Sequence, residues 1–80
     1  MDYSKMSLSD IAFEILSDWN NVNFAAKPYL EAMCSLQSIK DNYYLDSGTS
    51  IVAYFLCNAS TWRGTVAREI KKELNKRIKS

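Results

Sequence analysis

The sequence predicts a single all-α domain, a compact bundle of about four helices spanning residues 1–80. The composition is that of one globular domain, since 48% of the 80 residues are hydrophobic and 24% are charged. Apolar residues recur at spacings of three and four in several segments, which is the period of an amphipathic helix. A hydroxyl or amide side chain that can cap a helix stands before each of these segments.

The first helix is predicted over residues 8–19. Ser7 can cap it, and the carboxylate of Asp10 favours the positive end of the helix. Asparagines at 20, 21 and 23 end it, because short amides compete for backbone hydrogen bonds. The residues that share its apolar face are Leu8, Ile11, Ala12, Ile15, Leu16 and Trp19.

The second helix is predicted over residues 25–37. Asn23 can cap it, and Pro28 is tolerated because it falls in the first turns, where its missing N–H has no intrahelical partner. Turn-forming residues then occupy positions 41–48 and enclose Tyr43 and Tyr44. We expect this stretch to be irregular, with a brief helical turn as an alternative.

The third helix, residues 47–59, is predicted to be the central element. Asp46 or Ser47 would cap it, and its side chains are apolar nearly all round, which is typical of a helix buried on most sides. The β-branched residues near its start leave a strand as an alternative.

The fourth helix is predicted over residues 62–79, capped by Ser60 or Thr61. Its apolar stripe is narrow and the positions between are polar or charged. We therefore expect a surface helix whose apolar edge packs on the third helix. The stripe consists of Val66, Ala67, Ile70, Leu74 and Ile78.

A core this small leaves a thin stability margin, so self-association as a homo-oligomer is an open alternative. The two cysteines, Cys34 and Cys57, lack paired or clustered spacing and are expected to be buried free thiols. No stretch has the length of a membrane span, and residues 1–10 lack the features of a signal peptide. We therefore expect a cytoplasmic protein.

Charge is distributed unevenly. The net charge is +1, yet residues 63–80 carry seven cations and two acids, a local charge of +5, and the remainder carries −4. This asymmetry predicts an anionic partner or an intramolecular docking of opposite charges.

The sequence lacks a catalytic signature, and we predict that the protein is not an enzyme. It has no histidine, the commonest general base near neutral pH. The acids Asp10, Glu14 and Asp18 are better explained as a solvated helix face. The two glycines form no nucleotide-binding pattern. No cofactor and no metal ligand set is expected.

The most promising site is the turn that precedes the fourth helix. Ser60 and Thr61 offer hydroxyls, Arg63 a planar fork for phosphate or carboxylate, and Trp62 a stacking face. Such a turn can hold a nucleotide or an acidic ligand. The structural alternative has Trp62 packed in the core and Arg63 paired with an acid of the first helix.

Two further surfaces are candidates for contact. Cations of the fourth helix can form a strip that meets phosphates without reading bases, namely Arg68, Lys71, Lys72, Lys76 and Lys79. A solvated helix face is the simpler explanation. Tyr43 and Tyr44 can form an exposed contact patch or cover the end of the bundle.

Residues 46–64, DSGTSIVAYFLCNASTWRG, together with Ala67-Arg68-Glu69-Ile70-Lys71-Lys72-Glu73-Leu74 and residues 25–33, resemble a family of small proteins of tailed bacteriophages and prophages. No activity is assigned to that family. The resemblance implies a phage origin, action in the host cytoplasm and function by binding, often against host defence or host transcription machinery.

Together these observations predict a small phage-encoded protein that modulates a host protein or a host defence system by direct contact. Trp62, Arg63 and the cationic side of the fourth helix would form the contact, with Tyr43 and Tyr44 as a second surface. The alternatives are a nucleotide sponge built on residues 60–63 and nonspecific nucleic-acid binding by the fourth helix.

Overall fold

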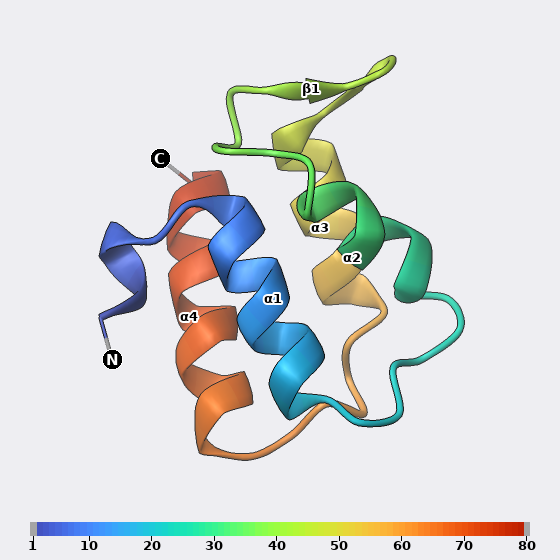
Figure 1. The fold of residues 1–80 in the computed structure, drawn as a ribbon, viewed down its shortest axis with the longest axis vertical. Helices are drawn as coiled ribbons and strands as arrows, with labels where there is room; N and C mark the ends of the chain where they lie inside the picture. The colour runs from blue at the N-terminus through green and yellow to red at the C-terminus, as the bar shows by residue number, and fades with distance from the viewer. Residues whose placement is uncertain (1, 80) are drawn as a thin grey trace.

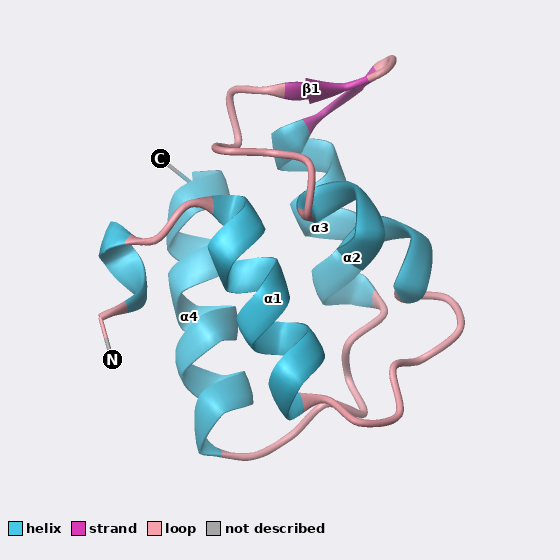
Figure 2. Ribbon diagram, viewed as in Figure 1, coloured by secondary structure: helices cyan, strands magenta, loops and turns pink. Residues whose placement is uncertain are grey.

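A computed structural model describes residues 2–79, and within that range the predicted four-helix, mostly α-helical fold is confirmed (Figures 1 and 2). A short 3-10 turn, η1, precedes the bundle, and a small two-stranded hairpin interrupts it. The elements are η1 (Tyr3–Lys5), α1 (Leu8–Asp18), α2 (Lys27–Met33), β1 (Asn42–Tyr43), β2 (Asp46–Ser47), α3 (Gly48–Cys57) and α4 (Thr65–Lys79).

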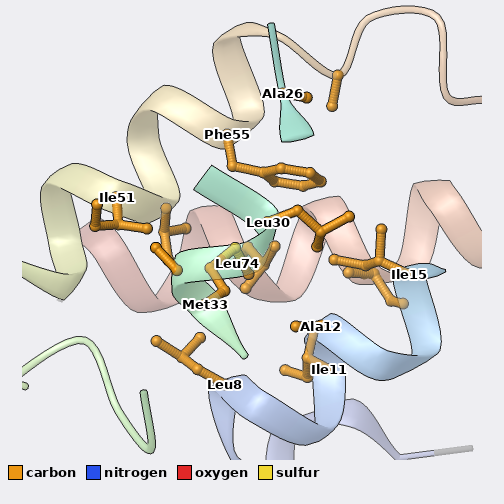
Figure 3. Packing of buried hydrophobic residues seen from close by; sticks show 14 of the residues in the cluster. Leu8, Ile11, Ala12, Ile15, Ala26, Leu30, Met33, Ile51, Phe55 and Leu74 are labelled. Carbon is orange, nitrogen blue, oxygen red and sulfur yellow. The ribbon is translucent and has the colours of Figure 1, made fainter. Parts of the chain in front are cut away.

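The four helices surround a single apolar core. α1 and α4 run side by side in one half of the molecule, and α2 lies against α3 in the other (Figure 1). Leu8, Leu30, Phe55 and Leu74, one from each helix, are fully buried and converge at the centre (Figure 3). α3 contacts α2, α4 and both strands, so the predicted central place of the third helix is confirmed.

The caps of α1 and α3 are formed as predicted. The Ser7 hydroxyl accepts a hydrogen bond from the amide of Asp10, and the Ser47 hydroxyl accepts one from the amide of Ser50, both at 3.1 Å. Each bond satisfies an amide that has no partner within its own helix.

One side of α3 is more open than its composition predicted. Ile51, Val52 and Phe55 are buried, whereas Tyr54 and Cys57 are exposed. The prediction that the helix is buried on most sides was therefore wrong for this face, and so was the prediction of a buried thiol at Cys57. Both cysteines are free thiols, and Cys34 is half-buried. The elements that contact α3, namely α2, α4 and the two strands, leave this outer face of α3 uncovered.

α2 is shorter than the predicted residues 25–37. After Met33 the backbone tightens, because the amides of Ser35 and Leu36 bond to carbonyls three residues back. The next two amides, those of Gln37 and Ser38, then donate to the carboxylate of Asp41. A side chain further along the chain has thus replaced the helical carbonyls as their acceptor.

Residues 41–48 form a hairpin in place of the irregular stretch or helical turn that we expected. Asn42 pairs with Ser47 and Tyr43 with Asp46, so Tyr44 and Leu45 form a two-residue turn at the tip. The base of the hairpin is tightly held: the amide of Gly48 donates to the carbonyl of Asp41 at 2.7 Å. A Cβ at Gly48 would lie 2.8 Å from the backbone of Ile39, so only glycine fits there.

α4 begins at Thr65, three residues later than predicted, and neither Ser60 nor Thr61 is at its cap. Gly64 precedes the helix with a φ of +115°, a backbone conformation that favours glycine. The chain turns here because Trp62 is directed into the core, and the helix starts only after that turn.

Candidate binding surfaces

Trp62 is a core residue, as the structural alternative proposed. Its side chain is only 2% exposed. The indole stacks on Trp19 with centroids 5.8 Å apart and meets Phe55 edge-on at 6.3 Å. A ring in this position is not available to stack on a base.

Polar partners also tie this ring to the fold. The indole Nε1 donates to Asp18 Oδ2 at 2.9 Å, so the α1 carboxylate that we expected beside Arg63 is bound to Trp62 instead. Lys71 lies over the ring of Trp62, with its ammonium 5.8 Å from the indole centroid. The ammonium donates to the carbonyls of Ala59 and Trp62, at 2.7 and 2.6 Å. Lys71 thereby links α4 to the segment that joins α3 to α4.

The environment of Lys71 is electropositive. Burial disfavours its charged form, and the nearby Arg63 guanidinium repels it, so the pKa of Lys71 lies below its usual value. Arg63 itself is exposed and makes no hydrogen bond or ion pair with any described residue. The prediction that Arg63 pairs with an acid of the first helix was wrong.

Arg63 and Lys71 border a shallow hollow beside the start of α4. Its lining residues are Trp62, Arg63, Gly64, Ala67, Arg68 and Lys71, with no acid among them. Arg68 is exposed and has no hydrogen-bond or ion-pair partner among residues 2–79. Ser60 and Thr61, predicted as anion ligands, are exposed in the preceding turn and do not line this hollow.

Two of the remaining predicted cations line a different hollow on α4. Lys72 and Lys76 border a second hollow next to η1, where Glu69 and Glu73 compensate their charge. On the same edge Arg77 pairs with Glu73 at 2.6 Å and donates to the carbonyls of Tyr3 and Met6, each at 2.8 Å. The predicted strip is therefore divided: Arg68 and Lys71 border the hollow by Trp62, whereas Lys72 and Lys76 face η1.

An apolar groove continues from Lys71 along the other half of α4. Its lining residues are Ala53, Leu56, Cys57, Lys71, Asn75 and Ile78, so it runs between the outer face of α3 and one side of α4. α3 itself has no charged residue. The sequence reasoning missed this groove, although the spacing from Lys71 to Asn75 and Ile78, four and then three residues, places all three on one side of a helix.

The hairpin tip is the most exposed apolar part of the molecule. Tyr44 is 86% exposed and Leu45 is fully exposed. Tyr43 is half-buried against the core and meets Tyr44 edge-on, with centroids 4.8 Å apart. Of the two predicted tyrosines, only Tyr44 is exposed, and Leu45, which the sequence analysis did not single out, is exposed beside it. The prominence of this tip, which projects beyond the ends of α2 and α3, is visible in Figure 1.

Tyr44 has a φ of +56°, in the left-handed region that bulky residues rarely adopt. It is the first residue of a two-residue hairpin turn, a position that favours glycine or asparagine. The pairing of β1 with β2 and the anchored base hold the backbone there. Tyr44 thus combines a strained backbone with an exposed aromatic side chain.

Across residues 2–79 no group of acidic or cysteine side chains is arranged to bind a metal ion, and no helix is long and apolar enough to cross a membrane. Comparisons of the chain with protein-family models, with curated proteins and with solved structures find no match. The class defined by the fold is thus a small four-helix bundle with a protruding hairpin.

Proposed function

We propose that this chain is a non-catalytic binding protein that contacts a partner protein through the tip of its hairpin. The observation that carries the proposal is the exposure of Tyr44 and Leu45 on a rigidly anchored turn. Tyrosine is enriched at the energetic centres of protein interfaces. A side chain that is already held in place loses less conformational entropy on binding than one in a mobile loop.

The shape of the tip suits an apolar pocket on a folded partner. Two adjacent apolar side chains at a convex end can enter a cavity that flat surfaces cannot fill. We further propose a bacterial host protein, or a component of host defence, as the partner; this step rests on the sequence resemblance of residues 46–64 to small bacteriophage proteins alone. In this proposal the hairpin enters the pocket and the bundle serves as its rigid support.

The two other hypotheses have less support from the geometry. A nucleotide sponge on residues 60–63 retains the guanidinium of Arg63, but the indole expected to stack on the base is buried. The hypothesis of nonspecific nucleic-acid binding by α4 has less support because the cations of this helix are distributed over two edges. One of these edges also carries Glu69 and Glu73.

Affinity capture from a bacterial lysate tests the proposal, with the immobilised chain compared against a double variant, Tyr44→Ser with Leu45→Ser. We expect a specific protein to be retained by the native chain and lost by the variant, because both apolar anchors are gone. Circular dichroism should show the same helix content for both, since neither side chain is part of the core.

Phe24→Ser is the matched control. Phe24 is 91% exposed in the loop between α1 and α2, so this variant removes an equally exposed apolar side chain at another site. Capture that survives loss of the tip, or that falls equally in Phe24→Ser, would overturn the proposal. Retention by the tip variant of a protein that elutes at moderate salt would point to α4 instead.

A further inference from the structure

We propose that the surface between α3 and α4 binds an acidic amphipathic helix of a partner protein. This surface, the α3–α4 channel, consists of the hollow bordered by Arg63 and Arg68 and the groove lined by Leu56 and Ile78. It is separate from the hairpin tip and does not depend on the function proposed for it.

The two hollows adjoin at one residue. Lys71 lines both of them, with the cationic hollow towards the start of α4 and the apolar groove towards its end. Lys71 is held in place by its bonds to the carbonyls of Ala59 and Trp62. Lys71 is therefore a fixed point in the middle of the channel. Cationic side chains lie towards the start of α4 and apolar side chains towards its end.

All the charged side chains that line the channel are cationic. No aspartate or glutamate lines either hollow, and Arg63 and Arg68 form no ion pair within residues 2–79. Burial is the main cause of the lowered pKa of Lys71, and the nearby Arg63 guanidinium adds to it. Carboxylates placed here would meet two guanidinium groups able to bind them in a bidentate manner. Charge complementarity thus specifies an acidic occupant.

The apolar groove specifies the rest of the occupant. Ala53 and Leu56 of α3 and Ile78 of α4 are half-buried, so they have apolar surface left to cover, and Cys57 beside them is exposed. A groove between two helices is the usual seat for a third, whose apolar residues recur at three and four. A nucleic acid has no apolar side to place against Leu56 and Ile78, so an acidic helix fits the whole channel better.

A synthetic peptide provides the probe. It is a helix of roughly 18 residues, or about five turns, with glutamates in the half that meets Arg63 and Arg68 and leucines at positions i, i+3, i+4 and i+7 in the half that meets Leu56 and Ile78. Two control peptides are used: one with lysine in place of every glutamate, and one of the same composition in scrambled order. Binding to the ¹⁵N-labelled full chain is followed by amide chemical shifts and calorimetry.

We expect the acidic helix to bind and to shift amides around Lys71, and both control peptides to bind at least about tenfold more weakly. Arg68→Glu should weaken binding of the acidic helix roughly tenfold, because it puts a like charge at the occupant's carboxylates. Lys72→Glu makes the same charge change on the η1 edge of α4 and should alter affinity less than about twofold. Leu56→Gln tests the apolar half and should also weaken binding about tenfold.

Several outcomes would overturn the proposal. They are the absence of binding at millimolar peptide, equal binding of the scrambled peptide, or shifts that map away from the channel. An equal loss in Lys72→Glu and Arg68→Glu would indicate a general attraction to polyanions. A native chain that elutes as a dimer, with Leu56→Gln as a monomer, would show that a second copy covers the groove. Binding that persists when Tyr44 and Leu45 are replaced by serine separates this surface from the hairpin tip.

Discussion

Two turns of this molecule have similar sequences and opposite structural roles. The junction before α4 places Trp62 and Arg63 among small polar residues, and the hairpin places Tyr44 and Leu45 in a stretch that begins Asp-Asn and ends Asp-Ser. Each turn contains a residue with positive φ, Gly64 in the junction and Tyr44 in the hairpin. Yet the aromatic ring is buried at the junction and exposed at the hairpin.

The difference lies in what the rest of the fold offers each ring. Trp62 finds Trp19 and Phe55 as ring partners, and Asp18 as an acceptor for its indole N–H. Among residues 2–79, the ring of Tyr44 contacts only that of its own neighbour, Tyr43. An aromatic residue in a polar turn therefore remains exposed where no distant element supplies a partner for its ring. The local sequence does not show whether such a partner exists.

Removal of the junction ring should have the largest effect. We expect Trp62→Ala to lower the free energy of unfolding by about 3–5 kcal/mol, since it leaves a cavity beside Trp19 and Phe55. Urea denaturation followed by far-ultraviolet circular dichroism measures the loss. In a domain of this size the variant is expected to be close to unfolding at room temperature.

Tyr44→Ala is the matched comparison at the tip and should lower the free energy of unfolding by only about 0.5–1.5 kcal/mol, because it removes the edge-on contact with Tyr43. Trp62→Phe, which keeps an aromatic ring but cannot donate to Asp18, should fall between the two. Equal losses in Trp62→Ala and Tyr44→Ala would remove the distinction between a structural and an exposed aromatic residue.

The second prediction concerns the backbone of the junction. Gly64→Ala should lower the free energy of unfolding by about 1–3 kcal/mol, because alanine is strained at a φ of +115°. A Cβ here would meet nothing within 4 Å, so the loss would be conformational and not steric. Thermal and urea unfolding both measure it. A neutral result would mean that the junction can adopt another backbone path, and that Gly64 does not fix the start of α4.

The fold could be predicted where local signals decide it. Ser7 and Ser47 each cap a helix; α1 starts at Leu8 as predicted, and α3 starts at Gly48, within one residue of its predicted start. The start of α4 and the hairpin could not be predicted in this way. One depends on the indole of Trp62 reaching α1, and the other on the carboxylate of Asp41 binding the amides of Gln37 and Ser38, beyond the end of α2.

The candidate surfaces were predicted in part for the same reason. The positive charge of α4 is evident from composition, but its division into two edges depends on which neighbour each edge faces. Arg68 and Lys71 lie towards the end of α3, whereas Lys72 and Lys76 face η1 and two glutamates. Helical spacing alone does not assign these residues to different edges, because Arg68 and Lys72 are only four residues apart. It does not say which side remains uncovered.

The third prediction has the smallest effect on stability and bears most directly on function. A bulky L-residue in the left-handed region costs about 1–2 kcal/mol, a cost that asparagine largely avoids. Tyr44→Asn also gives up the edge-on contact with Tyr43, worth about 0.5–1.5 kcal/mol. We therefore expect the variant to be as stable as the native chain or up to about 1 kcal/mol more stable in urea denaturation.

The same variant should lose capture of the partner protein, because the aromatic anchor is replaced by a short amide. Higher or equal stability together with lost binding would show that tyrosine occupies this position for contact and at the expense of backbone strain. A clear fall in stability would instead mean that the ring packs on the body of the domain. In that case Tyr44 and Trp62 would differ only in degree, and the contrast between the two turns would no longer identify a binding surface.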